Sequence, residues 1–197
     1  SAASDVYKRQ DGGYSHALAI IRSLTLKGHI VDCIGRPFCL SSFSNSLNKC
    51  SYRQSRFKDC YIEEFLLFLD RNEYDYLIPI GAESVDLVNK NRKEIQKRVI
   101  INLAPYESVK ICLEKPKLLS LAQEIGIPVP KNYIKTDLYS KSNNEKFVVK
   151  AISELSNAKV LYLTKNQILN SKLIDEKNFL IQDYIKGSGF GYFAIYD

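Results

Sequence analysis

The sequence predicts an α/β chain with a parallel sheet in its first half and an α+β arrangement with antiparallel strands in its second. Helical patterns alternate with short buried strands up to residue 103, as in parallel α/β units. The pattern changes near Pro105, so a boundary is expected between residues 103 and 112. The 197 residues, 45% of them hydrophobic and 25% charged, suffice for one ordinary domain or two small ones.

The first half starts with a glycine turn, a helix and a strand. Residues 11–13, Asp-Gly-Gly, predict a tight turn because glycine adopts positive φ without strain. Apolar residues recur at helical spacing over residues 17–26, and Ser15 is expected to cap this helix. Gly28 is a typical stop signal, and the β-branched run at residues 29–34 predicts a strand.

The helix and strand pattern then recurs twice. Residues 62–69 place apolar side chains on one helix face, and residues 76–80 (YLIPI) predict a strand. One or two helices are expected over residues 83–98, followed by a strand at residues 99–103 (VIINL). The segment 35–49 is rich in serine and asparagine, which favours a surface loop.

The second half opens with two short helical patterns. Pro116 suits the first turn of the second helix and Gly126 its end, while Pro128 and Pro130 force an extended segment. Alternating apolar runs then predict four strands and one helix. The strands are expected at residues 146–152, 158–163, 178–185 and 191–197, and the helix at residues 165–174.

Composition argues against several classes of protein. The net charge of +6 comes from scattered residues, and the basic stretch 89–98 is more typical of a solvated helix face than of a nucleic-acid patch. No apolar run could span a bilayer and no signal peptide is apparent, which predicts a cytoplasmic protein without a membrane partner. The five cysteines lack C-x-x-C spacing and only two histidines are present, so neither a disulfide framework nor a zinc site is predicted.

Two lysines and one late segment could bind a nucleotide. Lys115 precedes a helix, Lys150 ends the apolar run FVVK, and residues 182–185 (QDYI) end a later strand. Compact ammonium groups suit phosphates, and an extended peptide edge in an apolar cleft can pair with adenine. Taken singly, each feature also has a structural interpretation, as an edge charge reaching water or an ordinary strand end.

In their order and spacing, these segments resemble the ATP-grasp superfamily. The matching stretches are EK and AQEIGIPVPKNYI after residue 113, FVVK, and FLIQDYIKGSGFGYFAIYD from residue 179. The closest branch is that of the carbamoyl-phosphate-synthase-like carboxylate–amine ligases, and residues 11–31 resemble the start of the domain that precedes the ATP-grasp fold there. The resemblance implies a Rossmann-like pre-ATP-grasp domain at residues 11–103. The first, α+β part of a truncated ATP-grasp fold would follow at residues 104–197.

The resemblance also implies roles for the two lysines. Lys115 and Lys150 match the lysines that contact the ATP phosphates in the family. Many relatives have a glycine-rich loop after the second lysine. This chain has AISELSNA at residues 151–158, without glycine, which departs from the pattern of close backbone approach to phosphate.

The late segment matches the hinge that reads adenine. Gln182 matches the position that meets the adenine amino group or the ribose. Asp183 and Ile185 match positions whose main-chain atoms bond adenine, and Tyr184 is expected to pack within the hinge. Some relatives carry a ribose-binding acid shortly afterwards, whereas residues 188–189 are Ser-Gly.

The activity implied for the parent protein is that of a ligase with ATP and Mg²⁺ as cofactors, acting through an acyl phosphate. ATP and a small carboxylate would be its partners, with a homodimer as an open option. The metal-binding and catalytic residues are expected beyond the last residue, so the chain alone is expected to be inactive. Gly12 and Gly13 either face the carboxylate substrate or merely join strand to helix, and residues 1–10 are expected to be non-native because they replace the usual first strand.

Two other classes stay open. The Gly-Gly turn also suits a Rossmann-type domain that binds a nucleotide sugar or a dinucleotide, although the third glycine of that motif is missing. A non-catalytic nucleotide-binding or structural fragment is the second alternative.

Overall fold

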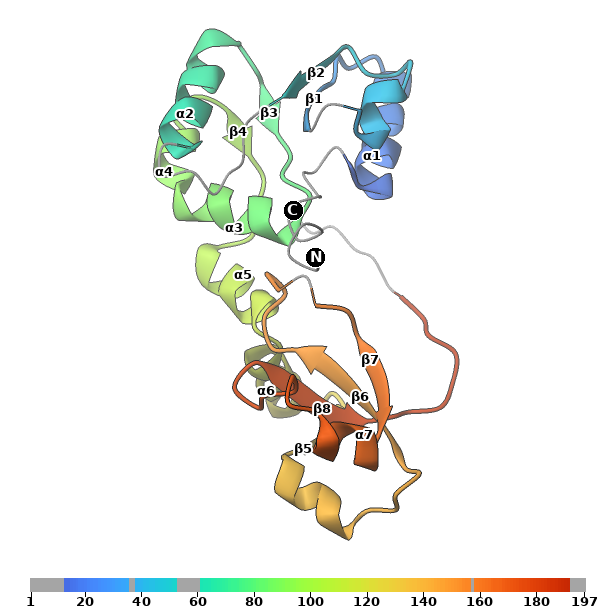
Figure 1. The fold of residues 1–197 in the computed structure, drawn as a ribbon. Helices are drawn as coiled ribbons and strands as arrows, with labels where there is room; N and C mark the ends of the chain where they lie inside the picture. The colour runs from blue at the N-terminus through green and yellow to red at the C-terminus, as the bar shows by residue number, and fades with distance from the viewer. Residues whose placement is uncertain (1–12, 36–37, 53–60, 157, 192–197) are drawn as a thin grey trace. The chain divides into compact units, whose positions relative to one another are not determined.

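The computed structural model describes residues 13–35, 38–52, 61–156 and 158–191. The chain divides into two units, Ser1–Lys110 and Ile111–Asp197, and the division falls within helix α5 (Tyr106–Leu113) (Figure 1). The predictions for residues 1–10, for Gly12 and for residues 192–197 lie outside the described residues. No helix in the described ranges combines the length and apolarity needed to cross a bilayer.

The first unit alternates helices with short strands, as the sequence predicts. Its elements are α1 (Ser15–Leu26), β1 (Asp32–Gly35), η3 (Leu40–Phe43), β2 (Lys49–Tyr52), α2 (Tyr61–Arg71), β3 (Tyr76–Leu77), α3 (Ala82–Lys90), α4 (Arg92–Ile95) and β4 (Ile100–Ile101).

Both strand pairs of the first unit are parallel. Asp32 of β1 lies opposite Lys49 of β2, and Tyr76 of β3 lies opposite Ile100 of β4. Parallel pairing is therefore confirmed, although the described strands form two separate two-stranded sheets. The segment predicted as a loop over residues 35–49 connects β1 to β2 and, in its described part, contains the short η3. Strand β2 was not predicted, because its sequence KCSY has no apolar run to signal a strand.

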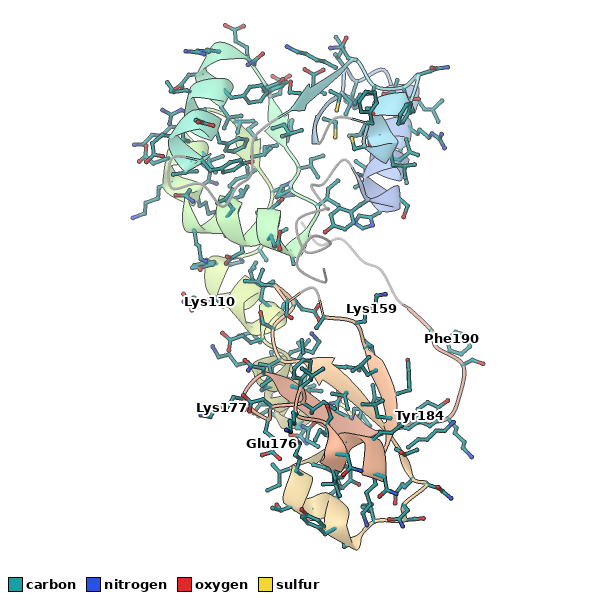
Figure 2. The ribbon with its side chains drawn as sticks, in the orientation of Figure 1. Lys110, Lys159, Glu176, Lys177, Tyr184 and Phe190 are labelled. Atoms are coloured by element: carbon teal, nitrogen blue, oxygen red, sulfur yellow. The ribbon has the colours of Figure 1, made fainter. Side chains whose placement is uncertain are left out.

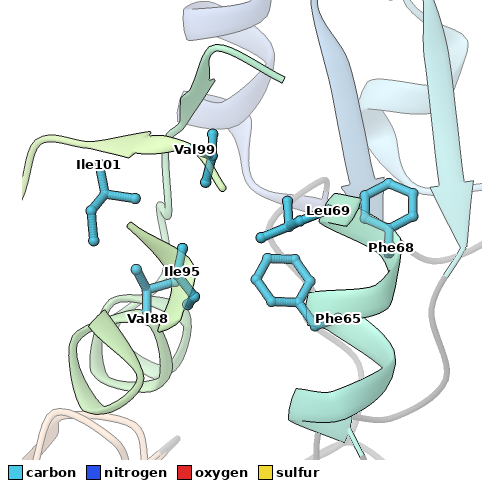
Figure 3. Close-up of a cluster of buried hydrophobic side chains, with 7 residues drawn as sticks. All are labelled: Phe65, Phe68, Leu69, Val88, Ile95, Val99 and Ile101. Carbon is cyan, nitrogen blue, oxygen red and sulfur yellow. The ribbon is translucent and has the colours of Figure 1, made fainter. Parts of the chain in front are cut away.

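An apolar cluster between α2, α3, α4 and β4 forms the core of this unit (Figure 3). The buried side chains are Phe65, Phe68, Leu69, Val88, Ile95, Val99 and Ile101. The three residues from α2 recur at i, i+3 and i+4, the spacing that places them on one helix face. Burial of each such side chain contributes about 1.5–3 kcal/mol, so this cluster is a large stabilising contribution to the unit.

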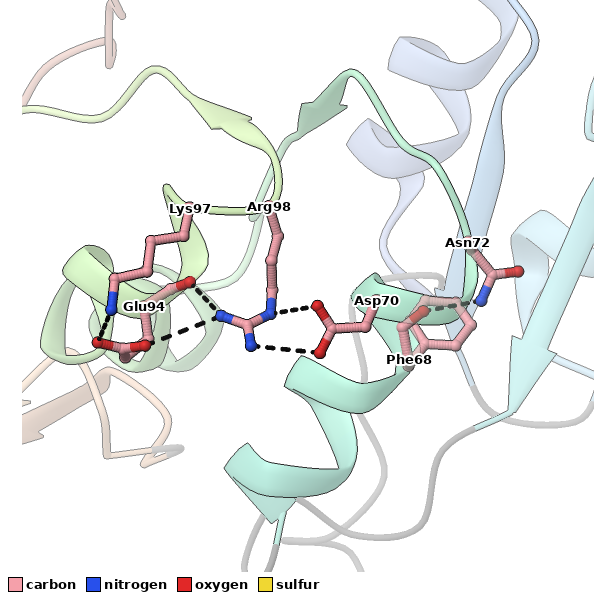
Figure 4. A network of polar contacts seen from close by, with 6 residues as sticks. All are labelled: Phe68, Asp70, Asn72, Glu94, Lys97 and Arg98. Carbon is pink, nitrogen blue, oxygen red and sulfur yellow. Dashed lines mark hydrogen bonds and ion pairs between the residues drawn. The ribbon is translucent and has the colours of Figure 1, made fainter.

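A polar network beside the core links α2 to the segment after α4 (Figure 4). The Nε and Nη2 atoms of Arg98 donate to the two carboxylate oxygens of Asp70 at 2.7 and 3.2 Å. Nη1 of the same side chain donates to the backbone carbonyl of Glu94 at 2.8 Å. Because the pair is partly exposed, it contributes about 1 kcal/mol or less and mainly fixes the geometry of the two segments.

The second unit contains a four-stranded sheet. After α5, its elements are α6 (Lys115–Glu124), β5 (Asn132–Tyr133), η4 (Lys135–Ser140), β6 (Lys146–Ala151), β7 (Leu161–Thr164), α7 (Lys165–Asn170) and β8 (Phe179–Asp183). The strand order is β5-β8-β6-β7 and every pairing is antiparallel, which confirms the prediction for this half.

One face of this sheet packs against η4 and α7. The buried cluster comprises Tyr133, Leu138, Phe147, Val149, Ile168, Ile174 and Ile181. Along β6, Phe147 and Val149 are completely buried while Val148 and Lys150 between and beside them are half-buried. This alternation shows that β6 turns one face to the core and the other away from it.

Glycine ends two of the helices. Gly28 follows α1 with φ +86°, and its N–H and that of the next residue donate to carbonyls of the last turn at 3.0 and 3.2 Å. Gly126 follows α6 with φ +78° in the same arrangement, a Schellman motif. At the start of α1 the predicted cap is wrong, because Tyr14 occupies the N-cap position and no side chain, including that of Ser15, caps the helix.

Candidate functional site

Two of the candidate residues lie on the face of the four-stranded sheet that points away from the buried cluster of the second unit. We call it the open face. Lys150 alternates with the buried Val149 along β6 and therefore lies on this open face. Gln182 of β8 lies directly opposite Val148 of β6, so its side chain projects from the same face. The antiparallel register thus brings Lys150 and Gln182 to adjacent strands on one side of the sheet.

The side chain of Gln182 is held in a defined orientation. It is only 2% exposed, and its Nε2 donates to Oδ1 of Asn132 at 2.9 Å. A buried amide needs such a partner, because an unsatisfied one costs about 1–3 kcal/mol. Gln182 is therefore a packed and oriented group of the sheet, and its contact with adenine stays a prediction.

Lys115, the second candidate lysine, is anchored to the loop that follows β6. Its backbone N–H donates to the carbonyl of Ile152 at 2.9 Å, and the N–H of Glu154 donates to the carbonyl of Leu113 at 2.8 Å. The Nζ atom of Lys115 forms an ion pair with Oε1 of Glu154 at 2.9 Å. The start of α6 is therefore fixed next to the strand end that carries Lys150.

The predicted hinge, residues 182–185, begins within β8. Its second residue, Asp183, is anchored twice: its N–H donates to the carbonyl of Lys131 at 3.1 Å, and its carboxylate accepts from the hydroxyl of Tyr133 at 2.8 Å. Tyr184 contacts Tyr162 edge-on with 5.9 Å between ring centres, and it is 42% exposed (Figure 2). Ile185 is 66% exposed. Both hinge residues that follow β8 are therefore accessible to solvent.

A hollow of about 620 Å³ borders the same hinge. Its lining residues are Asn144, Glu145, Lys146, Asp183, Tyr184 and Lys186. The hollow lies at the start of β6, whereas Lys150 lies near the end of that strand. It does not include either candidate lysine, so we place the candidate site on the open face rather than in this hollow.

The candidate substrate loop and metal ligands have less structural support. Gly13 precedes α1 without positive φ, and a Cβ built there would meet nothing within 4 Å, so neither feature demands glycine. Its role in substrate binding stays a prediction, as does that of Gly12. In the described ranges, no group of three or more histidine, cysteine, aspartate or glutamate side chains could hold a metal ion.

Sequence reasoning missed four residues that shape the site: Asn132, Tyr133, Glu154 and Tyr162. Each acts through a side chain from another strand or loop, and no local pattern indicates such a contact. A weak signal existed only for Glu154, an acid four residues after Lys150 where phosphate-binding loops usually have glycine.

No protein-family model and no curated protein sequence matches the chain. It is similar to the structure of an L-amino acid ligase from Bacillus licheniformis, with TM-score 0.61 and 12% identity over 86% of this chain and 41% of that chain. For a D-alanine–D-alanine ligase from Bacillus anthracis the TM-score is 0.51 and the identity 17%, over 88% and 54% of the two chains. For an N5-carboxyaminoimidazole synthetase from Staphylococcus aureus complexed with ADP the TM-score is 0.51 and the identity 14%, over 85% and 43%.

These three neighbours are ATP-grasp ligases, and the chain spans about half of their length. At such low identity the similarity concerns the fold alone. The described chain therefore shares a mixed α/β fold with part of the ATP-grasp ligases.

Proposed function

We propose that the chain is the ATP-binding portion of an ATP-dependent carboxylate–amine ligase. The observation that carries the proposal is the open sheet face on which Lys150 and Gln182 lie on adjacent strands, next to the exposed hinge edge. Three structural neighbours that are ligases, one of them solved with ADP, support the same assignment. The carbamoyl-phosphate-synthase-like branch and a Rossmann-like domain over residues 11–103 belong to this proposal, as does the ATP-grasp part over residues 104–197.

The site offers separate groups for the two ends of ATP. The ammonium groups of Lys115 and Lys150 would neutralise phosphate oxygens, which they suit as compact charges on flexible stems. The amide oxygen of Gln182 and the main-chain atoms of Asp183 and Ile185 would meet the adenine edge. Tyr184 would support the hinge through its contact with Tyr162.

In the whole protein, an oxygen of the substrate carboxylate would attack the γ-phosphorus of ATP, and ADP would leave with the bridging oxygen. An amine would then attack the acyl carbon of the resulting acyl phosphate, release phosphate and lose a proton. The contribution of the described residues is to position ATP and to balance its charge. Magnesium is part of the proposed activity, but the described residues form no cluster suited to hold it, and no step is derived through the metal.

The test is a calorimetric titration of the whole protein with ATP. Lys150→Ala removes a charged contact, which typically contributes about 1.5–3 kcal/mol, so affinity should fall about ten- to hundredfold. Lys177→Ala is the matched control, because this exposed lysine lies in the segment before β8, away from the hinge (Figure 2). Equal ATP affinity of the Lys150→Ala variant and the unmodified protein would contradict the proposal.

A further inference from the structure

Three consecutive residues, 131–133, hold the first two residues of the hinge. The carbonyl of Lys131 accepts from the N–H of Asp183 at 3.1 Å. Oδ1 of Asn132 accepts from Nε2 of Gln182 at 2.9 Å, and the hydroxyl of Tyr133 donates to Oδ1 of Asp183 at 2.8 Å. The two side-chain contacts join residues 50 positions apart in the sequence and follow from the register of β5 against β8, in which Asn132 lies opposite Gln182.

The two side-chain contacts hold the hinge from opposite faces of the sheet. Tyr133 belongs to the buried core, 8% exposed, and its ring meets Phe147 edge-on with 5.5 Å between ring centres. Asn132 follows the alternation of the strand and lies on the open face with Gln182. Rotation of β8 about its own axis would break one contact or the other, so the pair fixes the orientation of the strand end.

Charged groups near Tyr133 affect the pKa of its hydroxyl, which donates the hydrogen bond to Asp183. The Nζ atoms of Lys131 and Lys141 lie 5.2 and 4.8 Å from the centre of the tyrosine ring, and Lys141 also pairs with Glu145 at 3.1 Å. Two cations thus lie near the ring, and the carboxylate of Asp183 accepts from its hydroxyl. The hydrogen bond to Asp183 is the main cause that raises the pKa of Tyr133, with burial adding to it and Lys141 opposing it. The phenol stays protonated at neutral pH and acts as the donor.

Beyond Asp183 the described hinge has no strand to hold it. Residues 184–191 form no helix or strand, and Tyr184 and Ile185 are both exposed. The position of this peptide edge therefore depends on how well residues 182 and 183 are fixed. A binding edge that is already in place costs less ordering free energy when the ligand arrives.

We propose that Asn132 and Tyr133 are positioning residues for the adenine-binding edge at residues 183–185, an inference that rests on the proposed function. They do not contact the nucleotide themselves. They hold Gln182 and Asp183 from the two faces of the sheet, so that the hinge main chain meets the base with little rearrangement.

The test separates binding of the base from binding of the phosphates. Tyr133→Phe keeps the ring and removes only the hydroxyl, and Tyr139→Phe makes the same change at a tyrosine that is 70% exposed. In the whole protein, ATP affinity is measured by calorimetry. The affinity for inorganic tripolyphosphate, which has no base, is measured by displacement of a fluorescent ATP analogue. We expect Tyr133→Phe to weaken ATP binding about three- to tenfold and to leave tripolyphosphate binding unchanged, with no effect of Tyr139→Phe.

Asn132→Ala provides a second variant at an exposed residue of β5, and it should show the same selective loss. Circular dichroism establishes that each variant is folded at the temperature of the titration. An equal loss for ATP and tripolyphosphate in both variants would overturn the inference, because it indicates general loosening. Unchanged ATP affinity would also overturn it while leaving the proposed function intact, provided that Lys150→Ala still weakens ATP. If Lys150→Ala has no effect either, the proposed function and the inference fail together.

Discussion

In the proposed site, Glu154 would compete with the ATP phosphates for Lys115, so removal of its charge should strengthen ATP binding. The carboxylate lies 2.9 Å from Nζ of Lys115, on the loop that follows the strand of Lys150. A triphosphate that uses Lys115 must displace this carboxylate or accept it as a neighbouring negative charge. Glu154→Gln keeps the shape of the side chain and removes its charge, so it isolates the electrostatic effect.

The size of the expected gain in ATP affinity follows from the exposure of the ion pair between Lys115 and Glu154. The side chain of Glu154 is 50% exposed and that of Lys115 21%, which places their interaction in the range of about 0.2–1 kcal/mol measured for partly exposed pairs. Release of Lys115 should therefore raise ATP affinity by a factor of about 1.4 to 5. The loop should keep its conformation, because the backbone bonds from Lys115 to Ile152 and from Glu154 to Leu113 remain.

The assay is calorimetric titration of the whole protein with ATP at about 0.01 M and 0.15 M salt. The increase in ATP affinity caused by Glu154→Gln should be larger at the lower ionic strength, where the Debye length is about 30 Å rather than about 8 Å. Glu107→Gln is the control, since Glu107 is 80% exposed and pairs with Lys110 at 3.1 Å outside the candidate site. Unchanged or weaker ATP binding by Glu154→Gln at low salt would refute the reasoning, if Lys150→Ala still reduces affinity.

Two further predictions concern the first unit. Gly28→Ala should lower the free energy of unfolding in urea by about 1 kcal/mol, because alanine is strained at φ +86° although no atom lies within 4 Å of its Cβ. Gly13→Ala, equally uncrowded but without positive φ, should change it less, and an equal loss in both would contradict the explanation. Burial, and then the nearby Cys39, raise the pKa of Cys50 from 9.0 to about 11. The protonated thiol therefore adds to the free energy of unfolding below pH 9, and this contribution is lost as the pH rises toward 11. Since only the thiolate reacts, alkylation of Cys50 followed by peptide mass spectrometry should accelerate up to about pH 11 in the folded protein. A plateau near pH 9, as expected after denaturation, would contradict this prediction.

The sequence alone determined the elements whose signals are local. Gly28 and Gly126 stop their helices because each supplies the positive φ that a Schellman motif needs. The alternation of β6 is also a local signal, since this strand buries every second residue, whereas β8 buries the consecutive residues Ile181 and Gln182. In contrast, β2 carries no apolar run that would signal a strand, and it is recognised only from its parallel pairing with β1.

For the candidate site, the order of the motifs identified Lys150 and Gln182, but it did not indicate that their side chains share one face of the sheet. Whether the two side chains share a face depends on the register between β6 and β8, and a slip of one residue would turn Gln182 toward the core. Tertiary structure also decides two further sets of contacts. These are the ion pair of Lys115 with Glu154 and the hydrogen bonds from Asn132 and Tyr133 to the hinge. Such contacts join residues far apart in the chain. Their geometry is set by strand pairing and core packing, which no local sequence pattern encodes.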